Sequence, residues 1–203
     1  MKTTFLRVAA LLTCAFTVAT AQVPAVRQGS FEVGGFIGSS FGLDHYQVMG
    51  GGNVSYGVTK YLLPYVEYSY FPGIERHIPY VFPSTGVPFT LAQAIPFSDF
   101  HGGVHVRIPI RESRLVPYAV IGFGGLKSFD RTASATFQGI TVNGIPVKGE
   151  TDFAINGGGG LRYYIGQSYG IRFEAKVYKP YGGSSGFNDT FGKVEFGFFF
   201  QLH

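Results

Sequence analysis

Charged residues are scarce in this 203-residue chain. Lysine, arginine, aspartate and glutamate together make up 14% of it, whereas a soluble globular domain carries about 25%. This charge is too sparse for a fully wetted surface. The composition also excludes a disordered chain, because disorder needs high charge and few aromatic residues, and this chain has 13 Tyr and 21 Phe.

The chain also has only one cysteine, and it lacks long apolar runs and simple repeats. The single cysteine, Cys14, lies near the N-terminus. No stretch beyond residue 21 has 18 consecutive apolar residues, so we expect no transmembrane helix. The 30 glycines fall in irregular clusters, which excludes a collagen-like chain, and the composition is not that of a coiled coil.

The N-terminus has the organisation of a secretory signal peptide. Lys2 and Arg7 precede an apolar stretch over residues 8–18, and Ala19-Thr20-Ala21 is a small-residue cleavage site. We predict a signal peptide over 1–21 and a single mature domain over 22–203. Loss of Lys2, Arg7 and the only cysteine leaves a mature chain without disulfides and with a formal net charge of +2 instead of +4, which does not suggest a nucleic-acid partner.

Two other interpretations of this segment stay open. A membrane anchor would need roughly 20 apolar residues, which is more than the run contains. A lipoprotein signal would use Leu11-Leu12-Thr13-Cys14, in which threonine before the cysteine fits poorly.

The mature chain alternates between apolar and polar residues with a period of two, as in residues 171–178. Successive side chains of a strand point to opposite faces, so this pattern predicts strands with one apolar and one polar face. We predict eight, at about 30–38, 47–57, 61–71, 97–108, 116–128, 151–164, 170–179 and 191–202. Most are longer than the usual five or six residues and suit a tilted strand that crosses a bilayer in about 9–11 residues.

The connections between these strands alternate in length. Those at 58–60, 109–115 and 165–169 are short, those at 72–96, 129–150 and 180–190 are longer, and the first, at 39–46, is intermediate. Short turns at one end and long loops at the other are typical of an outer-membrane barrel. We therefore predict an all-β fold, an eight-stranded antiparallel up-and-down transmembrane β-barrel.

One face of the predicted strands carries nearly all their charge. On it lie Glu32, Glu67, Asp99, Arg107, Asp152, Arg162, Arg172, Glu174, Lys176, Lys193 and Glu195. The other face has no charge in mid-strand; Lys127 and Lys179 are at strand ends, where long side chains reach the interface. A lysine or arginine that faces lipid at the midplane costs roughly 2–4 kcal/mol. We therefore predict a polar lumen, whereas a soluble lipocalin-like barrel would need an apolar one.

Six acids and five bases on one face predict a lumenal ion-pair network, because the interior of an eight-stranded barrel is just wide enough for side chains to fill it. Hairpin register suggests Arg162 near Glu174, and Lys176 near Glu195. Packing within the lumen is the favoured role of these charges, with a role in permeation or catalysis as the alternative.

The segment from Gly157 to Tyr164, a short turn, the segment from Gly170 to Glu174 and the aromatic-rich end from Val194 to Leu202 carry a family resemblance. The chain resembles the small outer-membrane barrels of Gram-negative bacteria, the OmpA/OmpX-type superfamily (outer membrane protein beta-barrel domain). The resemblance implies antiparallel eight-stranded topology, outer-membrane location and recognition of the C-terminal strand by the barrel-assembly machinery. It does not imply one activity.

The sequence contains no convincing catalytic, cofactor or metal motif. His101 and His105 would lie roughly 13 Å apart on a strand, too far to share one metal ion. His45 with Asp44 and Ser39 or Ser40 is the only local cluster with hydrolase-like residues, and His77 with Glu75 is similarly unsupported. We expect no enzymatic activity, no cofactor and no metal.

Two long loops and the strand ends complete the pattern. Loop 72–96 is apolar and has five prolines, so it is expected to cap the barrel mouth or, alternatively, to present a surface to a partner. Asn143-Gly144 predicts a hairpin turn in loop 129–150, and the flanking strands would then extend beyond the membrane.

Aromatic belts are expected at both interfaces, from Tyr56, Tyr61, Tyr163 and Tyr164 at one end and Tyr68, Tyr70, Phe97, Phe153, Tyr181 and Phe191 at the other.

We interpret the chain as a monomeric outer-membrane barrel with a structural, surface-interaction or narrow-pore role. Its expected partners are outer-membrane lipid and lipopolysaccharide, the barrel-assembly machinery and a possible surface partner of loop 72–96. A small channel or carrier for hydrophobic solutes and a lipid A-modifying enzyme are the alternatives. No periplasmic domain is expected, because the last predicted strand ends the chain.

A membrane barrel and a soluble one differ in gel mobility. The protein extracted from membranes is expected to migrate differently before and after boiling, because a closed transmembrane barrel stays folded in detergent until heated. A single heat-independent band from a soluble fraction would instead favour the lipocalin-like alternative.

Overall fold

The computed structural model describes residues 27–42, 47–73, 75–81, 86–94, 96–110, 113–181 and 190–202. The predicted signal peptide lies outside these residues. Within these ranges no helix is long and apolar enough to cross a membrane.

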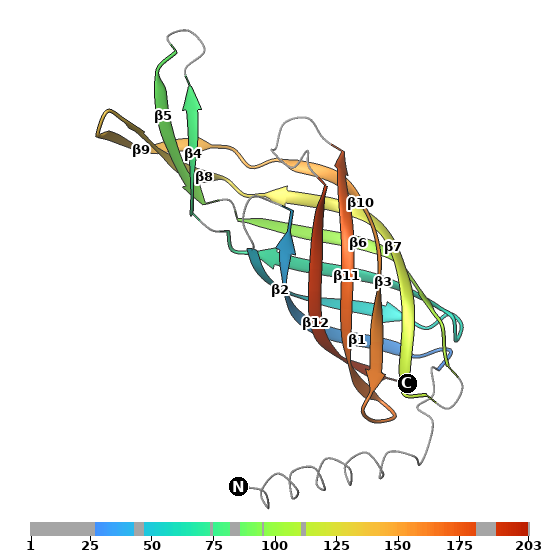
Figure 1. The fold of residues 1–203 in the computed structure, drawn as a ribbon. Helices are drawn as coiled ribbons and strands as arrows, with labels where there is room; N and C mark the ends of the chain where they lie inside the picture. The colour runs from blue at the N-terminus through green and yellow to red at the C-terminus, as the bar shows by residue number, and fades with distance from the viewer. Residues whose placement is uncertain are drawn as a thin grey trace, which may run out of the picture.

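Eight antiparallel strands form a closed barrel (Figure 1), which confirms the predicted fold class. They are β1 (Phe31–Phe41), β2 (Gln47–Tyr56), β3 (Leu62–Phe71), β6 (Phe97–Arg107), β7 (Leu115–Ser128), β10 (Thr151–Tyr164), β11 (Tyr169–Tyr181) and β12 (Phe191–Leu202). Each pairs with the next in this order, and β1 closes the barrel by pairing with β12. Their ends differ from the predicted ranges by only a few residues.

The two faces of the barrel are those that the alternation predicts. In β3, Glu67 points inward and is 2% exposed, whereas the neighbouring Val66 and Tyr68 point outward and are each 46% exposed. All eleven charged residues of the predicted lumenal face are buried. A polar interior within an apolar exterior is the arrangement of a transmembrane barrel and the reverse of a soluble one.

The aromatic belts are only partly as expected. Tyr56, Tyr61 and Tyr163 at the short-turn end and Tyr68, Tyr70, Phe153 and Tyr181 at the long-loop end are exposed on the outer surface. Tyr164, Phe97 and Phe191 are buried in the lumen instead, which corrects the prediction for these three. Their positions in the two-residue repeat place them on the inner face, where they pack against other rings.

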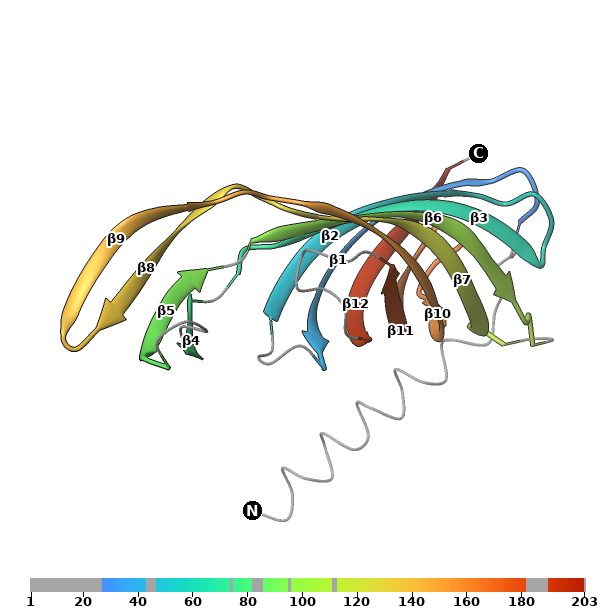
Figure 2. The ribbon, with the colours of Figure 1, turned by 90° about the horizontal axis from the view of Figure 1, so that it is seen from above.

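A second antiparallel sheet continues four of the barrel strands beyond the long-loop end. It consists of β4 (Glu75–Val81), β5 (Pro88–Ala94), β8 (Arg131–Phe137) and β9 (Ile140–Val147), in the order β4-β5-β8-β9. These strands prolong β3, β6, β7 and β10, which are neighbours in the same order in the barrel. Figures 1 and 2 both show the second sheet extending away from the barrel end. Loop 72–96 therefore contains a hairpin of this sheet that extends away from the barrel, which corrects the expectation that the loop caps the barrel mouth.

The turn of the β8–β9 hairpin is not at Asn143-Gly144. Gln138 and Gly139 form the tip, with φ of 47° and 83°, and positive φ at both central residues is characteristic of a type I′ hairpin turn. Asn143 and Gly144 lie opposite the single residue Ser134 within the ladder, where the register shifts, and Gly144 has a φ of 80°. The Asn-Gly signal thus marks a β-bulge that requires a left-handed glycine.

Adjacent glycines in β7 provide a matched test of the packing. A Cβ on the inward-facing Gly124 would lie 2.0 Å from the carbonyl oxygen of Phe100, whereas a Cβ on the outward-facing Gly125 would meet nothing closer than 3.7 Å. Gly124→Ala is therefore expected to lower the free energy of unfolding by about 1–3 kcal/mol, the usual cost of overpacking. Urea unfolding in lipid vesicles measures it, and Gly125→Ala is the control. Equal effects of the two substitutions would contradict the assigned faces.

Candidate functional site

The lumen is the part of the structure in which polar side chains converge. At its centre is Lys176 from β11, whose Nζ lies 2.7 Å from Glu67 of β3, 2.6 Å from Glu174 and 3.8 Å from Glu195 of β12. Oxygen atoms of these three carboxylates lie within 4.8 Å of one another. The ammonium group of Lys176 thus occupies the position in which three converging carboxylates could hold a cation.

Two further cations complete this central cluster. Lys193 of β12 donates to Glu67 at 2.7 Å and to Ser69 at 2.9 Å, and its Nζ is 3.2 Å from Asp99 of β6. Arg172 of β11 donates to Glu195 at 2.9 Å and to Glu67 at 3.4 Å. Glu67 therefore contacts three basic side chains that reach it across the lumen.

A second cluster lies closer to the short-turn end and joins the first. Glu32 of β1 accepts hydrogen bonds from Arg162 of β10 and from Arg107 of β6, the latter at 3.3 Å. Arg162 also donates to His105 Nδ1 at 3.0 Å, and His105 Nε2 lies 3.3 Å from Glu174. The two clusters together contain five acids and five bases, so their formal charges cancel.

Only one of the two predicted pairings is found, although both pairs are diagonal neighbours in the ladder. Lys176 does lie beside Glu195, but Arg162 pairs with Glu32 and not with Glu174. In the ladder, Arg162 faces Arg172, and Lys176 faces Lys193, so directly opposed residues have the same charge. Each cation finds its acid across the lumen, from a strand that is distant in the sequence.

Other candidate residues are not brought together into a catalytic arrangement. Asp152 is buried near the long-loop end, and within the described ranges no basic side chain pairs with it. His101 contacts Asp99, whereas His105 stacks on Tyr65 with a centroid distance of 4.3 Å. Ser39 and Ser40 lie in β1. Asp44, His45 and the side chains of Glu75 and His77 lie outside what the structure describes.

Buried aromatic rings lie in the lumen on both sides of the ion pairs. Phe71 stacks on Phe97 with centroids 4.1 Å apart, and Tyr178 stacks on Phe191 at 4.9 Å, all at the long-loop end. Val116, Tyr164 and Phe199 form a buried cluster at the short-turn end. Alternation along the strands places these rings on the same face as the lumenal charges, so the belt prediction for Tyr164, Phe97 and Phe191 overlooked a signal that the sequence contains.

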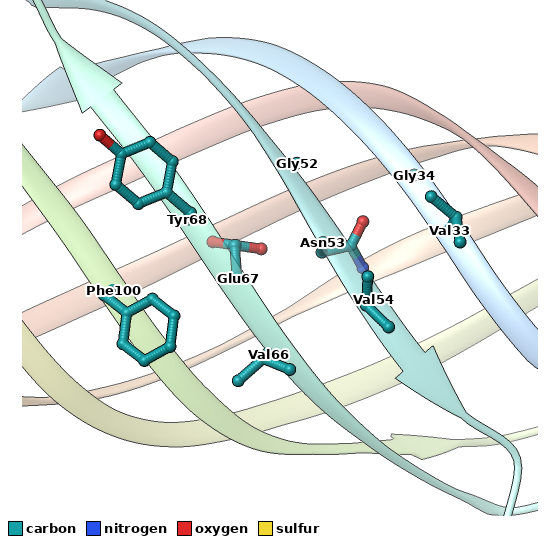
Figure 3. Close-up of a pocket in the computed structure, with 9 residues that line it drawn as sticks. All are labelled: Val33, Gly34, Gly52, Asn53, Val54, Val66, Glu67, Tyr68 and Phe100. Atoms are coloured by element: carbon teal, nitrogen blue, oxygen red, sulfur yellow. The ribbon is translucent and has the colours of Figure 1, made fainter.

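The outer surface has a separate feature, an apolar hollow of about 360 Å³ over β1, β2, β3 and β6 (Figure 3). Its walls include Val33, Val66, Tyr68 and Phe100, all of which are exposed on the outward face. We call it the lipid-facing hollow.

The fold is that of known small outer-membrane barrels, although the sequence is distant from them. The N-terminal β-barrel domain of Pseudomonas aeruginosa OprF superposes with a TM-score of 0.54 at 15% identity, covering 86% of this chain and 98% of that one. Neisserial surface protein A (NspA) gives 0.51 at 13% identity, with coverages of 84% and 95%. Pseudomonas aeruginosa OprG gives 0.51 at 12% identity, with coverages of 90% and 100%. No protein-family model and no curated protein sequence matches the chain.

The chain thus has the fold of the small eight-stranded outer-membrane barrels, with a salt-bridged lumen. Because the sequence identity to these structures is low, the likeness concerns the fold alone.

The contacts of Glu67 predict a large loss of stability when its charge is removed. Glu67→Gln leaves Lys176, Lys193 and Arg172 short of one shared carboxylate, and breaking a buried ion pair in this way typically costs about 3–5 kcal/mol. Asp152→Asn is the control, because Asp152 is buried but outside the network, and its effect should stay below about 1 kcal/mol. Unfolding in lipid vesicles compares the two; a Glu67→Gln effect as small as that of the control would mean that the network does not depend on Glu67.

Proposed function

We propose that this protein is a non-enzymatic resident of the bacterial outer membrane whose plugged barrel anchors and presents the second sheet at the cell surface. The observation that carries the proposal is the combination of a filled lumen with a strand extension at the long-loop end only. Long loops of outer-membrane barrels are extracellular and short turns periplasmic, so the second sheet would face the medium.

The filled lumen favours an anchor over a channel or carrier. The ion-pair clusters join strands on opposite sides of the barrel, from Glu67 in β3 to Lys193 in β12, and stacked rings lie between them and the long-loop end. A solute could pass only if several buried ion pairs separated at once, and each buried ion left without its partner costs several kcal/mol.

The second sheet favours a surface-interaction role. Its β9 edge exposes Ile140 at 69% and Val142 at 57%, and exposed apolar side chains outside a membrane are common at interaction sites. Pro146 in β9 and the bulge at Asn143-Gly144 interrupt the hydrogen-bonding edge of the strand, which protects it against pairing with other edges. A partner would therefore bind the side chains and not extend the sheet.

The remaining parts of the proposal concern targeting and assembly. Residues 1–21 would direct export and be removed after Ala21. The C-terminal strand β12 would be recognised by the barrel-assembly machinery, and the barrel would remain a monomer surrounded by outer-membrane lipid and lipopolysaccharide.

Surface exposure of the second sheet can be tested by thiol labelling, because the mature chain has no native cysteine. Ile140→Cys in β9 is expected to react with a membrane-impermeant maleimide in intact cells. The matched control is Val58→Cys in the short turn after β2, which is 46% exposed and should react only after the outer membrane is permeabilised. Reaction at Val58→Cys but not at Ile140→Cys in intact cells would reverse the proposed orientation.

Planar-bilayer recordings test the plugged lumen, with little or no stepwise conductance expected from the purified protein. Regular single-channel steps would instead support the channel alternative. Release of fatty acid from lipopolysaccharide by the purified protein would contradict the non-enzymatic part of the proposal.

A further inference from the structure

The lipid-facing hollow is an open depression of about 360 Å³ on the outer wall of the barrel. Its floor includes Gly52, which has no side chain, and its walls are the outward-facing side chains of Val33, Val66, Tyr68 and Phe100 (Figure 3). These four side chains are between 40% and 59% exposed, so the hollow opens outward and not into the lumen. Asn53 and Glu67 also line it, but both residues are buried, so the surface that the hollow exposes is almost entirely apolar. In an outer membrane this face would be surrounded by acyl chains.

A cationic and aromatic group borders the extracellular end of this hollow. The register places Tyr70, Ser98 and Lys127 in one row across β3, β6 and β7. The row of Tyr68 and Phe100 is two residues, or about 7 Å, further into the membrane. Lys127 therefore lies at the headgroup level of a lipid whose chain would occupy the hollow.

Ring contacts hold this group together. The Nζ atom of Lys127 lies 5.9 Å from the ring centroid of Phe129, and that ring lies 6.1 Å from the ring of Tyr70. Amphipathic aromatic and lysine side chains are favoured at the membrane interface, because one end is apolar and the other is hydrated.

The charges of the outer surface point to an anionic occupant. Within the described barrel strands, Lys127 and Lys179 are the only charged residues on the outward face, and both are at extracellular strand ends. Lys127 is the nearer of the two to the hollow, because β7 is next to β6, whereas β10 and β7 separate β11 from β6. A basic residue near a membrane surface attracts anionic headgroups by about 1 kcal/mol.

We propose that the lipid-facing hollow binds lipopolysaccharide, with an acyl chain over Gly52 and a phosphate at Lys127. The commitment to this lipid rests on the proposed outer-membrane orientation, because the cation lies at the end of the hollow that would face the outer leaflet, which consists of phosphorylated and acylated glycolipid. The thiol-labelling experiment above tests that orientation separately from lipid binding.

The absence of tryptophan makes a direct optical test possible. Phe100→Trp places the only indole of the chain at the wall of the hollow, and Phe173→Trp places it on the outward face of β11 as the control. Each variant is reconstituted in phosphatidylcholine vesicles with brominated acyl chains, which quench the indole, and lipopolysaccharide is then added in increasing fraction. We expect fluorescence of the Phe100→Trp variant to recover and saturate at a low fraction, while the Phe173→Trp variant follows only the dilution of the quencher.

Two matched pairs of substitutions locate the contacts in the Phe100→Trp background. Lys127→Gln is expected to raise the half-saturating fraction of lipopolysaccharide about fivefold, and Lys179→Gln to leave it unchanged. Gly52→Leu fills the hollow and should abolish the saturable recovery. Gly159→Leu should not; it is an outward glycine of β10 whose Cβ would lie 3.0 Å from the carbonyl oxygen of Tyr118, as crowded as the Cβ of Gly52, which would lie 3.2 Å from that of Gly34. Heat-dependent gel mobility establishes that each variant is folded, and the Lys127 pair remains informative if Gly52→Leu does not fold.

Three results would overturn the proposal. The first is recovery that follows simple dilution at both indole positions. The second is an equal shift for Lys127→Gln and Lys179→Gln. The third is phosphatidylglycerol acting at the same fraction as lipopolysaccharide, which would reassign the site to anionic phospholipid.

Discussion

The contact between Lys176 and the carboxylates of Glu67 and Glu174 is the interaction on which the rest of the barrel depends. Its two distances, 2.7 and 2.6 Å, join β11 to β3 across the lumen and to a neighbouring position on β11 itself. An ion buried without a partner costs several kcal/mol, whereas a paired and hydrogen-bonded one is tolerated. Each of these charges is therefore stable in the lumen only when the strands that carry the others are in place, so that strand register and barrel closure are coupled to the same network.

The like-charged pairs in the ladder make that coupling stronger. Arg162 lies opposite Arg172, and Glu174 lies opposite Glu195, and like charges in directly opposed positions destabilise an isolated pair of strands. In the closed barrel the repulsion is offset by partners from the far wall, such as Glu32 for Arg162. The hairpins would therefore be poorly stabilised as separate units, and the energy that favours the fold becomes available when the sheet closes.

Outside the lumen the barrel is asymmetric, because the second sheet and the lipid-facing hollow each involve only some of its strands. Four neighbouring barrel strands continue into the second sheet, and the β8–β9 part of it remains in register with β7 and β10 up to the bulge opposite Ser134. The lipid-facing hollow lies over β3 and β6 of that group and over the adjacent β1 and β2, where glycines such as Gly52 stand in place of large side chains. One barrel thus has a filled interior, an extended sheet at the long-loop end and an uneven outer wall, and these three features support separate proposals for stability, presentation and lipid binding.

Alternation along the sequence was enough to determine the number of barrel strands, their faces and the burial of all eleven lumenal charges, because a strand has a fixed two-residue period and a lipid-facing charge is costly. The same alternation could not identify partners, because Arg162 and Glu32 are 130 residues apart and meet only when β1 closes against β12. Nor could it show that Asn143-Gly144 forms a bulge and not a turn, because that depends on the register with which β8 pairs with β9. The sequence alone therefore determined which side of each strand is polar, and only the tertiary structure decided which charges meet, because those contacts cross a lumen that exists only after closure.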